Sequence, residues 1–362
     1  MQSYIINYWL LEEELTLSPH LKKSILNYYT DYQHIKWRHL IENWKDLTKI
    51  NDTCPFNENE LQYIRLNLKE RLKYYTQEHL EILTPYSQYF SNVLKNTQPR
   101  INLLYTKGNV ALLNLKKVAI VGSRKPTAYG RKVAYDLGKF LAQHNITVVS
   151  GMALGIDAQS HKGALDGGGN TIAVMPTDIN TVYPKTNSGI YNRIDTSTNL
   201  ILSEYREQSE PKHYHFPLRN RIISGISDLV VLVEAGEKSG TLITASHALD
   251  QGVPIVAVPG NITSDQSKGT NRLIFDGAVP LYNYEVILEI LDIKPQLQKK
   301  MRLDLSHSAR IVYEILLNRK KMTLNDLNFA TCLEYSEINA ALNELILEDL
   351  CDFVSLDEVE LT

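Results

Sequence analysis

The 362-residue sequence lacks the features of secreted, membrane-spanning and metal-binding proteins. Its three cysteines, Cys54, Cys332 and Cys351, are widely spaced and odd in number, so they give neither a disulfide framework nor a metal-site spacing. No apolar run approaches the ~20 residues that span a bilayer. The amino terminus lacks the basic start and apolar core of a signal peptide. These absences predict a cytoplasmic protein that does not enter a membrane.

The sequence also lacks a strong charge of either sign. Its net charge is −3, which argues against a chain that binds nucleic acid over its whole surface. Residues 300–362 carry 6 basic and 12 acidic side chains, whereas the rest is nearly balanced. An anion site is therefore expected as a local cluster of cations in the middle of the chain. The acidic C-terminal region favours a protein-binding module over a DNA reader.

Glycine is absent before Gly108, and the composition there differs from the rest. Apolar side chains recur at helical spacing, and Ser18-Pro19 is typical of a helix start, so residues 1–95 predict a small helical domain. Residues 294–305 are polar and proline-marked, as in a linker. Residues 306–362 show helical spacing for three helices and one terminal strand, which predicts a winged-helix-like domain.

Residues 96–293 contain a repeated strand pattern. Six short runs rich in β-branched residues end in Gly, Pro, Ser or Glu, and helical segments lie between most of them: 118–124, 146–151, 171–176, 200–204, 229–234 and 254–260. Strands that alternate with helices predict an α/β fold with a Rossmann-like, doubly wound parallel sheet. Ligands of such a sheet lie beyond the carboxyl ends of its strands.

Three turns in this region offer backbone amides near the start of a helix, where an anion is favoured. Their candidate phosphate-cradle residues are Gly122, Ser123, Gly151, Ser239, Gly240 and Thr241. Arg124 and Lys125 add charge to the first turn, although a tight turn with a surface arginine is an equally acceptable interpretation. None of the turns matches the dinucleotide fingerprint, the P-loop or the nucleophile elbow.

A further pair, Asp157 and His161, lies four residues apart and could share a helix side. An Asp-His pair can serve in catalysis, but no nucleophile with a supporting motif accompanies it. We therefore favour a structural hydrogen bond.

The densest cluster of cations and rings lies between Lys212 and Arg221. Single-stranded nucleic acid requires this mixture, because phosphates need charge and splayed bases need a stacking surface. The alternative is a buried Phe216, with Arg219 and Arg221 paired to Glu204 and Glu234. Both interpretations remain open at this stage.

Nine stretches together resemble the DNA-processing protein A family of bacteria, also called Smf. They occur in the family's order, over about residues 99 to 285: 118–124, 148–161, 171–176, 183–185, 202–205, 216–225, 233–235, 239–245 and 258–262. The resemblance implies a protein that binds single-stranded DNA, forms a homodimer and loads the recombinase RecA during natural transformation. It also implies that the helical domain of residues 1–95 is sterile-alpha-motif-like. It implies no catalysis, cofactor, metal or membrane.

By position, Arg124 matches the family's DNA-contacting arginine, and Lys185 and Lys212 match its other basic contacts. The full set of expected DNA-binding residues is Arg124, Lys125, Lys185, Lys212, Phe216, Arg219, Asn220 and Arg221. The alternative is a nucleotide-processing enzyme, because the core also resembles phosphoribohydrolases. Those enzymes carry a glutamate where this chain has Ile243 and Thr244, so the general base is missing.

Overall fold

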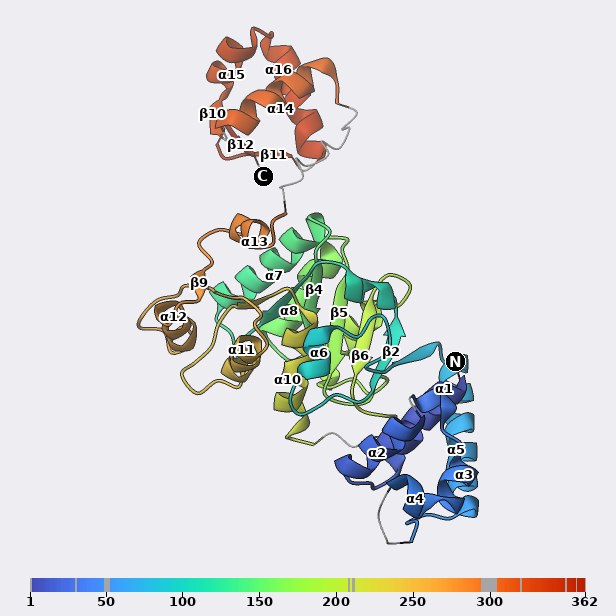
Figure 1. The fold of residues 1–362 in the computed structure, drawn as a ribbon. Coiled ribbons are helices and arrows are strands. Elements are labelled where there is room, and N and C mark those ends of the chain that lie inside the picture. The colour runs from blue at the N-terminus through green and yellow to red at the C-terminus, as the bar shows by residue number, and fades with distance from the viewer. Residues whose placement is uncertain are drawn as a thin grey trace. The chain divides into compact units, whose positions relative to one another are not determined.

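A computed structural model describes residues 2–29, 31–48, 53–207, 209, 212–293, 305–319, 321–348, 350–355 and 357–361 (Figure 1). The chain divides into two compact units, 1–294 and 295–362. Within the described ranges, every helix is too short or too polar to cross a membrane.

A nine-stranded sheet forms the centre of the first unit in the described residues, with the order β1-β2-β6-β5-β4-β3-β7-β8-β9. Its strands are β1 Leu80–Leu83, β2 Leu104–Gly108, β3 Lys117–Val121, β4 Thr147–Ser150, β5 Thr171–Met175, β6 Leu200–Ser203, β7 Leu229–Leu232, β8 Ile255–Ala257 and β9 Val279–Pro280. All neighbours from β6 to β9 are parallel, whereas β1 and β2 add an antiparallel edge. The Rossmann-like α/β fold is confirmed, with the six predicted strands in place.

One strand lies where only helices were expected. Strand β1 falls inside the predicted helical domain of residues 1–95 and pairs with β2, Leu80 opposite Lys107. Its four residues, Leu-Glu-Ile-Leu, are too few to separate a strand from a helical turn by spacing alone. The sheet therefore begins earlier in the chain than the sequence indicated.

Helices cover both faces of the sheet, which explains why its strands are almost wholly apolar. In β3, Val118 and Ile120 join the hydrophobic cluster on one face, and Ala119 and Val121 join the cluster on the other. The first face is covered by α7 Ala128–Gln143, α8 Ile156–Asp166 and α13 Glu285–Ile290. The second is covered by α6 Asn92–Asn96, α10 His215–Ile226 and α11 Thr241–Asp250 (Figure 1).

Helices α7 and α8 pack close together because each presents a glycine to the other, Gly138 from α7 and Gly163 from α8. A Cβ on Gly163 would lie 2.0 Å from the carbonyl oxygen of Tyr135. This contact fixes α8, and with it the glycine turn from which α8 starts.

The N-terminal helices pack in the same unit as the sheet. They are α1 Gln2–Trp9, a π-helix Leu10–Glu14, α2 Pro19–Tyr29, α3 Trp37–Glu42, α4 Trp44–Thr48 and α5 Glu58–Gln77. Trp9 stacks on Tyr75 of α5 with centroids 6.0 Å apart and meets Tyr105 of β2 edge-on at 6.1 Å. Trp9, Trp37 and Trp44 are all buried, so they serve as core and not as surfaces for bases.

The second unit contains α14 His307–Arg319, β10 Lys321–Thr323, α15 Leu324–Thr331, α16 Tyr335–Leu347, β11 Cys351–Phe353 and β12 Glu358–Leu361. Its three described strands form an antiparallel sheet with the order β10-β12-β11. The sequence predicted only one strand here. The other two are short and interrupted by polar side chains, Lys321 and Thr323 in β10 and Glu358 and Glu360 in β12.

Candidate nucleic-acid interface

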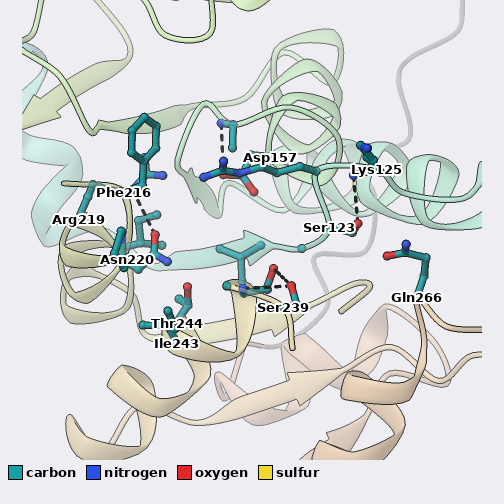
Figure 2. A pocket seen from close by; sticks show the side chains of 18 residues that line it. Ser123, Lys125, Asp157, Phe216, Arg219, Asn220, Ser239, Ile243, Thr244 and Gln266 are labelled. Carbon is teal, nitrogen blue, oxygen red and sulfur yellow. Dashed lines mark hydrogen bonds between the residues drawn. The ribbon is translucent and has the colours of Figure 1, made fainter. Parts of the chain in front are cut away.

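The site lies where the direction of the chain across the sheet changes. From β3 the chain continues through β4, β5 and β6 on one side, whereas β7, β8 and β9 lie on the other. Loops that follow neighbouring strands at such a switch point diverge and leave a crevice at the carboxyl edge. A pocket of about 540 Å³ lies here between the loops after β3 and β7 (Figure 2).

The structure brings most of the predicted site residues to this pocket. Its lining includes Gly122, Ser123, Arg124, Lys125, Phe216, Arg219, Asn220, Ser239, Gly240 and Thr241. Gly151 lines a smaller cavity of about 70 Å³, which shares Arg124 and Phe216 with the first. Lys185, Lys212 and Arg221 lie outside the lining of both.

Four cationic side chains are available to a ligand. Arg124 and Lys125 lie on the loop after β3, Lys185 follows Pro184, and Lys212 precedes α10; all four are exposed. None of them forms an ion pair with another described residue, in contrast to Arg193 or Arg221. Their charges are therefore not compensated by the fold.

Aromatic rings lie beside these cations. The Arg124 guanidinium is 5.3 Å from the ring centroid of Phe216, and Tyr183 meets that ring edge-on at 5.1 Å. Lys212 Nζ lies 5.8 Å from the ring centroid of Tyr214, which is itself exposed. Because Phe216 is half-buried and lines both cavities, its ring offers a stacking surface beside a cation.

Arg219 differs from what the sequence predicted. It is only 3% exposed, and its Nη1 donates hydrogen bonds to the carbonyl oxygens of Gly151 and Val174. Burial lowers the pKa of Arg219 to about 10, so it is still a cation at neutral pH. The guanidinium ties the ends of β4 and β5 together beneath the pocket, and the expectation of a free DNA-contacting group is wrong.

The expectation that Arg221 is a free DNA-contacting group fails for a similar reason. It is 2% exposed, and its Nη2 donates to both carboxylate oxygens of Glu204 at 2.8 and 2.9 Å. Helix α10 turns this side chain towards the interior, where an unpaired charge would be costly. The Glu204 pairing considered from the sequence is present, whereas Glu234 pairs with neither arginine but with Thr127.

Glu234 is a residue whose role the sequence did not reveal. Its carboxylate accepts hydrogen bonds from the Thr127 amide at 2.9 Å and the Thr127 hydroxyl at 2.6 Å, at the N-terminus of α7. A Cβ on Gly130 would lie 2.4 Å from this carboxylate, so Gly130 makes room for it. The only signal was a glutamate at a strand end, which is too common to identify a helix cap.

The predicted phosphate cradles are largely filled by the chain itself. The Ser123 amide donates to the Glu234 carbonyl oxygen at 2.7 Å, and the Gly151 amide donates to Asp157 Oδ2 at 3.1 Å. The Thr241 amide donates to the Ser239 hydroxyl at 3.2 Å. Since these three donors are already used, they are not free to bind an anion, and side-chain cations carry the positive charge at the site.

Asp157 and His161 do not bond to each other. Asp157 accepts from the amides of Gly151 and Ala153, and burial raises its pKa against the opposing charge of Arg219. His161 Nδ1 lies 2.7 Å from the Thr171 hydroxyl, and burial lowers its pKa to about 3. Both side chains thus have structural hydrogen bonds, as favoured from the sequence, although with other partners.

Fold and site together define a Rossmann-like α/β protein whose switch-point crevice is lined by free cations and rings. The sequence profile of the DNA recombination-mediator protein A family matches residues 81–292, more than half of the chain. The chain therefore belongs to this family. The match begins at β1, before the expected core boundary at residue 96.

Curated relatives agree with this assignment. The chain is 36% identical to the DNA processing protein DprA of Bacillus subtilis over 235 residues, 65% of this chain and 79% of that protein. It is 42% identical to DprA of Streptococcus pneumoniae over 176 residues, 49% of this chain and 62% of that protein.

Solved structures agree as well. The X-ray structure of DprA from S. pneumoniae matches with a TM-score of 0.63 and 30% identity, over 78% of this chain and 97% of that one. A structure of DNA processing protein A from Helicobacter pylori, described for its single-stranded DNA binding mode, matches with a TM-score of 0.53 and 30% identity, over 59% of this chain and 97% of that one.

Proposed function

We propose that this chain binds single-stranded DNA along the rim of the switch-point crevice, without cutting it. The carrying observation is that the exposed Arg124 guanidinium lies 5.3 Å from the ring centroid of Phe216, which Tyr183 meets edge-on. Lys125, Lys185 and Lys212 are exposed as well, and none of the four cations forms an ion pair with a described residue. The single-stranded DNA binding described for the H. pylori relative supports the same function.

Charges and rings have separate roles in this proposal. The cations bind phosphates irrespective of sequence, and Phe216 stacks on an unpaired base. A duplex offers the same phosphates but keeps its bases stacked inside, so it gains little from the ring. Affinity is therefore expected to be sensitive to salt, nearly independent of sequence and higher for single strands. Asn220 lines the same pocket, and its side-chain amide can donate a hydrogen bond to a phosphate or a base.

A catalytic function is the weaker candidate. Ile243 and Thr244 line the pocket at the position where phosphoribohydrolases carry their acid. Asp157 is the carboxylate in the described lining, and it is buried behind two amide hydrogen bonds. An assay for release of free base from a nucleoside monophosphate tests this alternative, and turnover would support it.

We further expect the chain to act as a homodimer that loads RecA on incoming strands in the cytoplasm, as the family resemblance implies. Exposed apolar side chains on α11, on α12 Lys268–Phe275 and around the edge strand β9 offer a surface for self-association: Leu249, Phe275, Val279 and Tyr282. Helices α11 and α12 both pack on the same hydrophobic cluster, so their outer faces are held in one rigid arrangement.

The deciding experiment is a salt-titrated anisotropy measurement with labelled single-stranded and double-stranded oligonucleotides of mixed sequence. Arg124→Ala and Lys212→Ala are compared with Lys139→Ala, an exposed lysine near the other end of α7. The proposal requires that the first two variants bind single-stranded DNA more weakly than the parent does. The Lys139→Ala control should keep the affinity of the parent. Unchanged binding for both rim variants would refute it.

A further inference from the structure

The C-terminal unit has charge of one sign only over most of its length. From Met322 to Thr362 the sequence contains ten acidic residues and no Lys, Arg or His. The cation just before this stretch, Lys321, is bound to Glu358 at 2.9 Å. Helix-turn-helix proteins that read DNA place their second helix in the major groove and require cations against the phosphates. Helix α16, which has this position, carries none.

Helix α16 nevertheless has a free face. Tyr335, Asn339, Asn343 and Leu347 are spaced four residues apart and so form one continuous ridge on the helix surface, inclined to the helix axis. All four are exposed, Leu347 by 85% and Tyr335 by 47%. Ile338, Leu342 and Leu345 of the same helix fill the core of the unit.

The free face continues onto α15. The Tyr335 hydroxyl donates a hydrogen bond to Asn325 Oδ1, which places its ring against α15. Phe329 lies four residues after Asn325, hence on the same side of α15, and is 89% exposed. Phe329, Tyr335, Asn339, Asn343 and Leu347 thus form one surface, the α15–α16 stripe. Its apolar ends lie roughly 18 Å apart along the α16 axis.

We propose that the α15–α16 stripe binds a basic amphipathic helix of a protein partner. The apolar ends offer contacts for a hydrophobic helix face, and apolar anchors spaced along a helix surface suit recognition of an amphipathic helix. The surrounding acids, including Glu334 and Glu348, attract lysines and arginines that flank such a face. Nucleic acid is repelled by the same charges, and so is a second copy of this unit, since each copy carries the same surplus of acids. The inference does not depend on DNA binding by the first unit.

The test uses the full chain and three labelled synthetic peptides. The first peptide carries leucines on one helix face and lysines elsewhere; the second has the same composition with the leucines scattered; the third has glutamates in place of the lysines. We expect the first to bind, more weakly as salt rises. The scattered peptide should bind about tenfold more weakly because it cannot present its leucines together. The glutamate peptide should not bind.

Variants locate the binding to the stripe. Phe329→Ser and Leu347→Ser should each weaken binding of the first peptide about fivefold or more, because each removes an apolar contact. The matched control is Leu317→Ser, which changes an exposed leucine on α14 of the same unit. This variant should bind the first peptide as the parent does. Circular dichroism verifies that the variants are folded.

Two results would overturn the inference: equal binding of the ordered and scattered peptides, or unchanged binding by both folded stripe variants. Duplex DNA binding that is lost in Phe329→Ser and Leu347→Ser would also overturn it, in favour of a DNA-reading surface. Single-stranded DNA binding, measured in parallel, should be the same in all these variants. A failure here is thereby distinguished from a failure of the DNA-binding proposal.

Discussion

Charge and stacking at the crevice can be separated with two substitutions at one contact. Arg124 lies 5.3 Å from the ring centroid of Phe216. Arg124→Gln removes the charge and keeps most of the side-chain length, whereas Phe216→Leu removes the ring and keeps an apolar group. If the cation binds a phosphate and the ring binds a base, the two variants should differ in their response to salt.

The magnitudes follow from the two interactions. Loss of one phosphate contact on a single strand lowers the slope of log affinity against log salt by about 0.7, so the defect of Arg124→Gln should shrink about 2.6-fold between roughly 50 and 200 mM salt. Phe216→Leu should cost about 1–3 kcal/mol, or roughly 5- to 150-fold, with the slope unchanged. Because the two groups touch, the double variant should fall short of additivity by about 0.5–1 kcal/mol.

A second pair with nearly the same geometry supplies the control. Arg272 lies 5.1 Å from the ring centroid of Phe275, on α12 and away from the pocket lining. Arg272→Gln should leave both affinity and slope as in the parent, whereas Phe275 is kept because it belongs to the proposed self-association surface. The measurement is anisotropy of a labelled single strand at several salt concentrations. An unchanged slope for Arg124→Gln, or equal slope changes for both site variants, would refute this division of roles.

Three further predictions concern stability and assembly. His161 has its pKa lowered to about 3 by burial, so the stability it contributes is present above its unfolded pKa near 6.5 and is lost as the pH falls from there towards 3. The free energy of unfolding, measured with urea and circular dichroism, should fall by about 1.4 kcal/mol per pH unit below pH ~6.5, and by less in His161→Gln. An identical pH dependence of the two proteins would show that His161 is not the cause. Glu204→Ala leaves the buried Arg221 guanidinium without its carboxylate, and should cost about 3 kcal/mol by the same assay, whereas a loss near zero would mean that water replaces the pair. Leu249→Glu, at a leucine that is 65% exposed, should shift the mass from dimer to monomer in light scattering, and a parent that is itself monomeric would exclude the homodimer.

Much of this protein could be predicted from its sequence because the signals are local. The six core strands are runs of buried residues that end in turn formers, and both faces of the sheet are covered, so each run reads as apolar throughout. The cations of the crevice are also local features of the loops that carry them. The nine stretches that resemble the family, in the family's order, showed that these loops belong to one known type of core. Strands β1, β2, β9, β10 and β12 were missed because each has only two to five residues, too few to give a distinct period.

The tertiary structure alone decided which charges are free. Arg219 and Arg221 belong to the same basic cluster as Lys212, but α10 turns both arginines inward, onto main-chain carbonyls and Glu204. The same holds for the Ser123 amide, whose partner, the Glu234 carbonyl oxygen, is brought to it by folding. A sequence specifies which groups can carry charge or donate a hydrogen bond. Whether a group is still available to a ligand depends on partners that are distant in the chain, and only the packed structure determines those.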